Sequence, residues 1–78
     1  MDTGMRGIIF GVYLHWVDRV ENLSRHAFIR DFRPVGAEML VKMLAEGLVY
    51  IDNDGFLHLT DTGTSTVNEW RIANGVPK

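Results

Sequence analysis

The stretch PVGAEMLVKMLAEGLVYIDNDGFLHLT, residues 34–60, decides the fold, because its hydrophobic period changes once, at Gly47. Up to the residue just after that glycine, apolar residues recur at the spacing of one helix face. They are Ala37, Leu40, Val41, Leu44 and Leu48. Pro34 suits a first helical turn, where its missing N–H is no loss, and Gly47 suits the left-handed position after a helix end. We therefore expect an amphipathic helix that begins near Pro34 and stops at Gly47.

Beyond Gly47, apolar and polar residues alternate, which is the period of a β-strand. One face would carry Val49, Ile51, Leu57 and Leu59, and the other would carry Tyr50, Asp52, Phe56 and His58. Between the two runs lies Asn53-Asp54-Gly55, a turn sequence whose residue types tolerate positive φ. The stretch therefore predicts a helix followed by a two-stranded hairpin. A helix and hairpin within some other α+β fold would show the same local signals.

A first helix is predicted over roughly Arg6–Glu21, after a loose end at residues 1–4. Apolar residues cover nearly its whole circumference, and a helix of this kind is buried on more than one side. One interpretation is a central core helix beneath the other elements. The other is that one flank meets a partner chain, either a second copy or another protein. The residues assigned to that partner surface are Phe10, Tyr13, Trp16 and Val17, with Trp70 from the last helix.

Two further helices are predicted from their capping residues. Ser24 is a good N-cap for a short helix over about Arg25–Phe32, which must end before Pro34 because the residue preceding a proline avoids the α region. Thr60 or Asp61 can cap a last helix that runs to about Asn74. Helix, short turn and helix in front of the hairpin form a helix-turn-helix arrangement.

Length and composition set the broad class. Seventy-eight residues allow one domain, with a core over about residues 6–74. Hydrophobic residues make up 46% of so short a chain, which suggests apolar surface left for a partner. There is no cysteine, so neither a disulfide framework nor a thiolate metal site is expected. The apolar run Ile8–Val17 is shorter than the roughly 20 residues of a membrane span. We expect a soluble, cytoplasmic protein without a signal peptide or a membrane partner.

The charge is unevenly distributed. The net charge is −2, which gives no overall attraction to nucleic acid. Residues 24–42 nevertheless carry four basic and two acidic side chains, a charge of +2, while the remainder carries −4. The predicted second and third helices are thus the only net-positive part of the chain.

The segment LVKMLAEGLVYIDNDGFLHLTDTG, Leu40–Gly63, resembles the winged helix-turn-helix DNA-binding domain of bacterial transcriptional repressors. Similar proteins include metal-dependent repressors of the diphtheria toxin repressor type and multiple-antibiotic-resistance repressors. Their shared signature is GLV opening the first wing strand and LT-x-x-G closing the second, which residues 47–49 and 59–63 match. The resemblance covers about residues 8–74. It implies an α+β fold with three helices, a two-stranded β-hairpin wing and a C-terminal helix.

The resemblance also implies a DNA-binding regulator, with double-stranded DNA as partner and a homodimer as its form. In such proteins the third helix enters the major groove. Here that helix would present Val35, Gly36, Glu38, Met39 and Lys42. Phosphates would be contacted by Arg25, Arg30, Arg33 and Lys42. The wing tip would be Asn53, Asp54 and Gly55.

The residue types also support an alternative function, a winged-helix protein–protein interaction module without DNA binding. DNA readers use Lys and Arg for phosphates and Arg, Asn or Gln for base edges. The candidate reading helix offers only Lys42 beside Glu38, and the wing tip carries Asp52 and Asp54, which repel phosphates. Outward Tyr50, Phe56 and His58 could stack on bases or simply cover the strand pair. For these three residues, stacking on bases and covering the strand pair both remain open.

Catalytic and metal chemistry is not expected, and no cofactor is predicted. The three histidines, His15, His26 and His58, fall on different predicted elements and lack the spacing of a metal site. His15 and Asp18 share a helix face and are interpreted as a surface pair. Ser24 beside His26 is explained as a helix cap rather than a nucleophile with its base.

Overall fold

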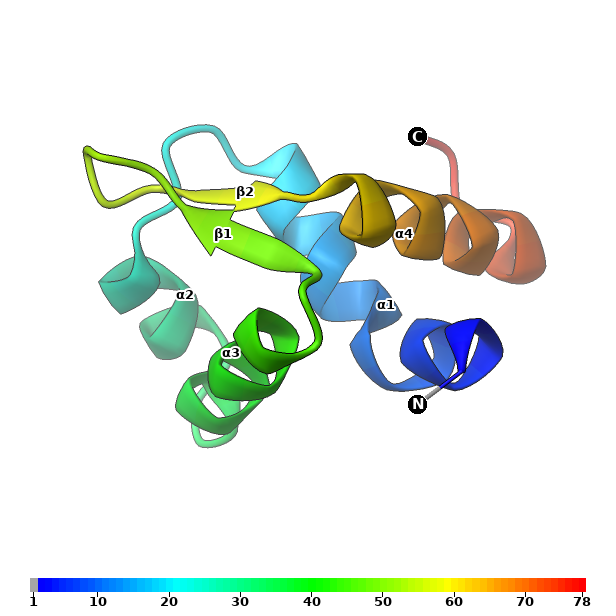
Figure 1. Cartoon of the computed structure of the whole chain (residues 1–78), viewed down its shortest axis with the longest axis horizontal. Helices are drawn as coiled ribbons and strands as arrows, with labels where there is room; N and C mark the ends of the chain where they lie inside the picture. Colours follow the sequence, from blue (N-terminus) through cyan, green and yellow to red (C-terminus); the bar gives the residue numbers. More distant parts are fainter. Residues whose placement is uncertain (1) are drawn as a thin grey trace.

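The computed structural model describes residues 2–78, which form four α-helices and a two-stranded antiparallel hairpin (Figure 1). In chain order these are α1 (Thr3–Arg19), α2 (Arg25–Asp31), α3 (Gly36–Ala45), β1 (Val49–Ile51), β2 (Leu57–Leu59) and α4 (Asp61–Asn74). The predicted α+β class and order of elements are confirmed for these residues. So is the cap of α4, where the Thr60 side chain accepts the backbone N–H of Gly63 at 3.0 Å.

The change of period at Gly47 produces the hairpin. Gly47 has φ +71°, the left-handed conformation expected after the end of α3. β1 then pairs with β2 in the register Val49↔Leu59, Tyr50↔His58 and Ile51↔Leu57. Val49 and Leu57 are buried, whereas Tyr50 and His58 are exposed, so the predicted two-face pattern is confirmed at these four positions. Phe56, predicted on the outward face, is half-buried where it bridges to Ser24.

Helix α1 begins earlier than predicted because Asp2 caps it. The Asp2 carboxylate accepts the backbone N–H of Met5 at 2.9 Å, which satisfies one of the free donors of the first turn. The loose end expected at residues 1–4 is therefore wrong for residues 2–4, and Met1 lies outside the described part. The helix ends at Arg19, two residues before the predicted Glu21.

Helix α3 begins at Gly36 and not at Pro34, and it is turned relative to the predicted apolar stripe. Leu40 and Leu48 are buried as expected, but Val41 is 66% exposed. Gly36 explains the turn, because a Cβ there would lie 2.8 Å from the carbonyl oxygen of Ile29 on α2. This close approach of α2 and α3 puts Gly36, Leu40 and Met43 on the inner face. It leaves Ala37, Val41 and Leu44, all predicted on the apolar stripe, outside.

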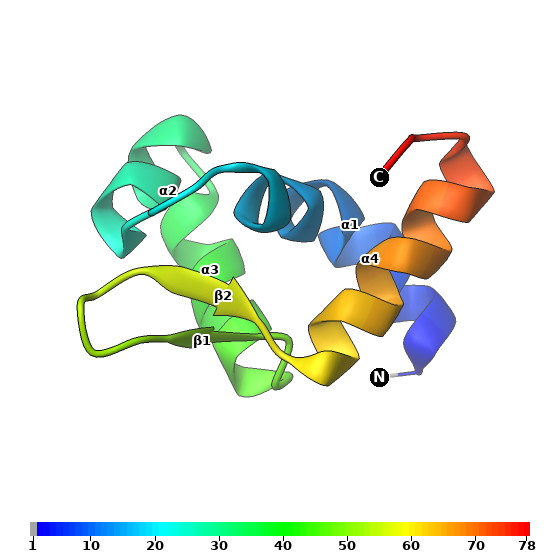
Figure 2. The ribbon, with the colours of Figure 1, turned by 90° about the horizontal axis from the view of Figure 1, so that it is seen from above.

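The core gathers around α1, with α2, α3 and the hairpin on one side and α4 lying across it on the other (Figure 2). Its buried apolar residues are Phe10, Leu14, Val17, Leu23, Phe28, Leu40, Met43, Leu48, Val49, Leu57 and Val67. Helix α4 lies close to α1 at Gly11, where a Cβ would come within 2.1 Å of the Trp70 ring. An isolated bridge between Ser24 and Phe56 ties the hairpin to the start of α2.

Candidate functional site

The outward side of α3 is accessible along its whole length, and it is largely apolar. Its exposed residues are Val35, Ala37, Glu38, Val41, Lys42, Leu44 and Ala45. The two charges on this side pair with each other, since Lys42 Nζ lies 3.4 Å from Glu38 Oε2. Met39, expected on the same side, is instead half-buried and packs against the core, because α3 is turned at Gly36. The predicted residues that this side does bring together are Val35, Glu38 and Lys42.

The three arginines of the net-positive segment are all exposed. Arg25 is the first residue of α2, and Arg33 lies in the turn between α2 and α3. Arg30, in the last turn of α2, donates to the adjacent Asp31 carboxylate from Nε and Nη2 at 3.3 and 3.2 Å. Together with Lys42 on α3, these arginines are the four cations of residues 24–42.

The hairpin tip is held by Asp52. One carboxylate oxygen accepts the backbone N–H groups of Asp54 and Phe56, both at 2.9 Å, and the other lies 2.6 Å from His58 Nε2. The Phe56 N–H, followed by the His58 ring, lowers the pKa of Asp52. Asn53 and Asp54 project from the turn, so the tip carries fixed negative charge.

The outward aromatic side chains of the hairpin cover the strand pair. Tyr50 and His58, cross-strand neighbours, stack with ring centroids 5.3 Å apart and planes inclined by 30°. Tyr50 remains 49% exposed. The pair therefore gives the outer face of the hairpin an aromatic patch beside the acidic tip.

The partner surface predicted on the first helix is corrected. Phe10 is fully buried and Val17 nearly so, because they face the inside of the molecule. Tyr13 is half-buried and meets Phe32 edge-on, with centroids 4.9 Å apart. Trp70 is half-buried over α1 and contributes to the core. Only Trp16, at 38% exposure, remains accessible on this surface, and its indole N–H donates to Asp31 at 3.1 Å.

The exposed apolar surface of α1 lies on a different side, which shares only Trp16 with the predicted set. Met5, Ile8, Val12 and Trp16 follow one another at i, i+3, i+7 and i+11 and are 49%, 80%, 49% and 38% exposed. We call this set the α1 stripe. Helix α1 is thus apolar all round because it has two apolar sides, an inner one in the core and an outer one facing solvent.

A polar cluster between α1 and α4 was missed by the sequence analysis. Arg71 is only 4% exposed, and its guanidinium donates to Asp18 Oδ2 at 2.5 Å, to His15 Nδ1 at 3.0 Å and to Asn68 Oδ1 at 3.1 Å. His15 and Asp18, interpreted as a surface pair, therefore serve to hold this cation. Burial, and next the charge of Arg71, lowers the pKa of His15.

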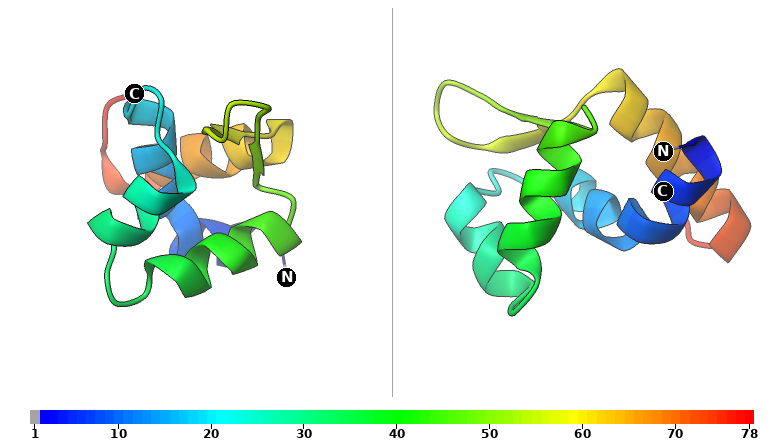
Figure 3. Two further views of the ribbon diagram at one scale, coloured as in Figure 1. Left: turned by 90° about the vertical axis from the view of Figure 1, so that its left-hand side faces the viewer. Right: turned by 60° about the horizontal axis from the view of Figure 1, so that its bottom comes forward.

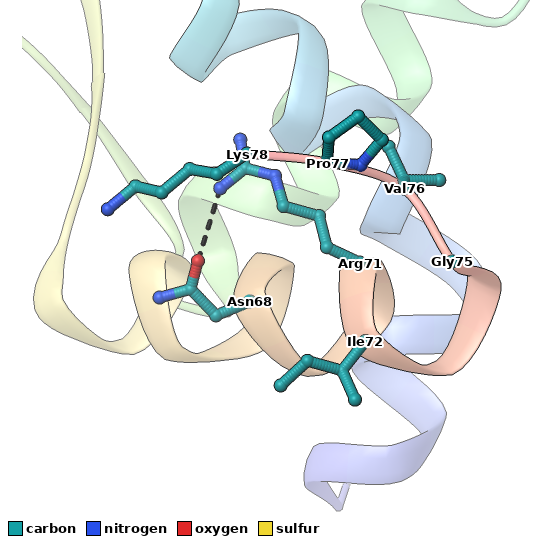
Figure 4. A pocket seen from close by; sticks show the side chains of 7 residues that line it. All are labelled: Asn68, Arg71, Ile72, Gly75, Val76, Pro77 and Lys78. Atoms are coloured by element: carbon teal, nitrogen blue, oxygen red, sulfur yellow. Dashed lines mark hydrogen bonds between the residues drawn. The ribbon is translucent and has the colours of Figure 1, made fainter.

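Two hollows lie beside α4. One, of about 440 Å³, is bounded by the C-terminal tail (Figure 4), and its lining residues are Asn68, Arg71, Ile72, Gly75, Val76, Pro77 and Lys78. Figure 4 shows Arg71 directed to Asn68, so its charge is already engaged. The other, of about 320 Å³, is a groove between α1 and α4 that has Gly4 and Gly7 on one side and Trp70 and Ala73 on the other.

Across residues 2–78, no three His, Asp or Glu side chains are grouped so as to hold a metal ion. In the same residues, no helix has the length and apolar character needed to cross a bilayer. Comparison of the chain with protein-family models, curated proteins and solved structures finds no match.

Proposed function

We propose that the chain is a winged helix-turn-helix domain that binds double-stranded DNA as a transcription regulator. The observation that carries the proposal is the exposed outward side of α3, together with the exposed arginines of α2 and the α2–α3 turn. Figure 3 shows α3 on the outside of the molecule, with α2 and the hairpin beside it. In this reading β1 and β2 are the wing, and α3 is the helix that enters the major groove.

The exposed residues of α3 define what such a helix would contact. Ala37 is small and lets the helix approach the groove closely. Val41 suits apolar contact with a thymine methyl group, and Glu38 can accept from the amino group of cytosine. Lys42 would leave its ion pair with Glu38 and contact a phosphate instead. Phosphate contacts position a protein on DNA, and base contacts give it specificity.

The number of cations sets the strength of the interaction. Arg25, Arg30, Arg33 and Lys42 allow about four phosphate contacts per copy. The logarithm of affinity should then fall with the logarithm of salt concentration with a slope of about −3 to −4. Asp54 at the hairpin tip opposes a wing–phosphate contact. A single copy should therefore bind DNA weakly at physiological salt.

Titration of a labelled 20-base-pair duplex by fluorescence anisotropy, at 20 and 150 mM salt, tests the proposal. We expect binding at low salt that weakens at high salt. Changing Arg30 and Arg33 together to Ala should reduce affinity and make the salt slope shallower by about 2. For a matched pair, Arg33→Ala should weaken binding, whereas Lys78→Ala removes the same charge from the C-terminal tail with little effect. Absence of binding at 20 mM salt would exclude a DNA-binding function.

A second candidate function, docking on another protein, is favoured by one observation. Val35 and Val41 are 40% and 66% exposed on the outward side of α3, and its two charges neutralise each other. An apolar centre rimmed by arginines suits a protein segment that combines apolar and acidic residues. Val41→Lys separates the two functions, because an added cation strengthens DNA binding but disrupts an apolar protein contact.

A further inference from the structure

The outer side of α1 carries four of the nine large hydrophobic residues that are exposed in residues 2–78. The α1 stripe spans Met5 to Trp16, about 17 Å along the helix, and includes Ile8 at 80% exposure. Helical spacing holds all four side chains on one narrow side. Contiguous apolar surface of this kind marks a site of contact with another protein.

The two ends of this side carry opposite charges. Asp2 precedes the α1 stripe, and Arg19, the last residue of α1, follows it; both are exposed. Arg19 donates from Nη1 to the backbone oxygen of Lys78 at 3.1 Å, and an arginine has five N–H donors in all. Two such helices packed in parallel would set like charges together. Packed antiparallel, they set each Asp2 against an Arg19.

We propose that the α1 stripe is a contact between two copies of this chain, with their α1 helices antiparallel about a two-fold axis. A two-fold axis midway along the stripe places each of its residues against an apolar residue of the partner. Met5 faces the partner's Trp16, and Ile8 lies beside the partner's Val12. The same axis joins Asp2 with the partner's Arg19. Because one patch is complementary to itself, the contact closes as a dimer rather than extending into a filament.

A contact of ordinary size would take a modest share of the surface of this chain. A standard interface takes about 800 Å² from each partner. That is about one sixth of the 4870 Å² surface of the chain. The groove between α1 and α4 adjoins the stripe at Ile8, so it extends the apolar area toward Trp70 and Ala73.

Disulfide cross-linking tests both the contact and its direction, because the natural chain has no cysteine. In the double variant Met5→Cys/Trp16→Cys, oxidation should give a covalent dimer. Within one chain the two positions are about 17 Å apart along α1, too far for a bond. Each single variant alone should stay uncross-linked, whereas a mixture of the two singles should cross-link. Cross-linking of the single variants with themselves would show parallel packing and overturn the proposal.

Sedimentation equilibrium of the unmodified chain provides the second test. We expect reversible dimers of the 8.9 kDa chain at micromolar to submillimolar concentration. Ile8→Glu should weaken the dimer by at least about tenfold, because it places a charge in the apolar contact. Ile72→Glu is the matched control: Ile72 is 83% exposed on α4, outside the stripe, and its substitution should leave the dimer unchanged.

A monomer at 1 mM, or equal weakening by Ile8→Glu and Ile72→Glu, would overturn the proposal. Far-UV circular dichroism of each variant confirms that it is folded before its association is interpreted. The dimer does not depend on DNA binding, and the two fail separately. Loss of dimer with DNA binding retained contradicts only the contact, and a dimer that binds no duplex contradicts only the proposed function.

Discussion

The half of the molecule built from α1 and α4 and the half built from α2, α3 and the hairpin use charge in opposite ways. Between α1 and α4, the Arg71 guanidinium is buried and fully engaged, while the outer surface is apolar at the α1 stripe. In the other half, the core contains only apolar side chains such as Phe28 and Met43, and the arginines lie at the surface.

This contrast in the placement of charge indicates which surface suits which partner. An exposed arginine keeps its hydration and can exchange water for a phosphate, as DNA binding requires. An apolar stripe gains from leaving water and suits a protein partner. Each half therefore suits one of the two contacts proposed above: α3 would bind DNA, and α1 would bind a second copy.

The largest expected change in the free energy of unfolding comes from removing the buried charge of the α1–α4 half. Arg71→Met should lower the free energy of unfolding by about 2–3 kcal/mol, because Asp18, His15 and Asn68 lose their shared donor. Urea denaturation at pH 7 measures this change. Arg30→Met is the matched substitution in the other half, where the Arg30 side chain is 60% exposed and paired with Asp31. It should cost less than about 1 kcal/mol. Equal losses in the two variants would remove the contrast between the halves.

The close packing of α4 on α1 provides the next test. A Cβ at Gly11 would overlap the Trp70 ring, so Gly11→Ala should destabilise the fold by about 1–3 kcal/mol. At Gly7 a Cβ would have no neighbour within 4 Å. Gly7→Ala should therefore stabilise the helix by up to about 1 kcal/mol. Thermal unfolding of the two variants should shift the midpoint in opposite directions, and a shift of the same sign would show that the contact at Trp70 is not tight.

The hairpin half was predictable from sequence because its signals are local. The end of α3 at Gly47, the alternation along the strands and the turn at Asn53-Asp54-Gly55 each depend on neighbouring residues only. The orientation of α3 was not predictable in the same way. Val41 and Met43 are both apolar, and which of them is buried depends on the approach of Gly36 to Ile29 in another helix.

The α1–α4 half was harder to predict because its contacts join distant parts of the chain. Arg71 meets Asp18 across 53 positions of sequence, and nothing beside either residue indicates the pairing. Helix α1 is apolar on both sides, so amphipathicity could not tell the buried Phe10 from the exposed Ile8. The predicted partner surface therefore included Phe10 and Val17, which lie in the core.

The pH dependence of stability should also differ between the halves. Burial lowers the pKa of His15, and Arg71 and Arg19 lower it further against the opposing effect of Asp18. The unfolded chain therefore takes up a proton near the ordinary pKa of 6.5, above the pH at which folded His15 does. Stability should be full above that pH and fall as the pH decreases toward the folded pKa. Urea midpoints at pH 7.5 and 5.5 should differ less in His15→Gln than in the unmodified chain.

His26 on α2 is the control for this prediction, because it is exposed in the other half of the molecule. His26→Gln should leave the difference between the two pH values unchanged. If both substitutions reduce the difference equally, the pH dependence does not arise from the Arg71 cluster.

The smallest expected effect is a change in DNA affinity caused by a substitution at the hairpin tip. This substitution tests whether the two halves have different partners. Asp54 is exposed at the turn, and the Asp52 carboxylate is occupied by backbone N–H groups and His58. Asp54→Lys replaces a repulsive charge by an attractive one without touching these bonds, because only the backbone N–H of residue 54 takes part in them. It should raise duplex affinity at 20 mM salt several-fold and steepen the salt slope by about 1.

Glu69→Lys makes the same change of charge on α4, in the half proposed to face protein. If α3 and the hairpin face DNA, Asp54→Lys should strengthen binding at 100 mM salt clearly more than Glu69→Lys, because phosphate attraction falls off within about 10 Å at that ionic strength. Equal strengthening by the two variants would mean that DNA responds to net charge alone and has no preferred side of the molecule. A larger effect of Glu69→Lys would reverse the assignment of the two halves, since it would place the DNA beside α4.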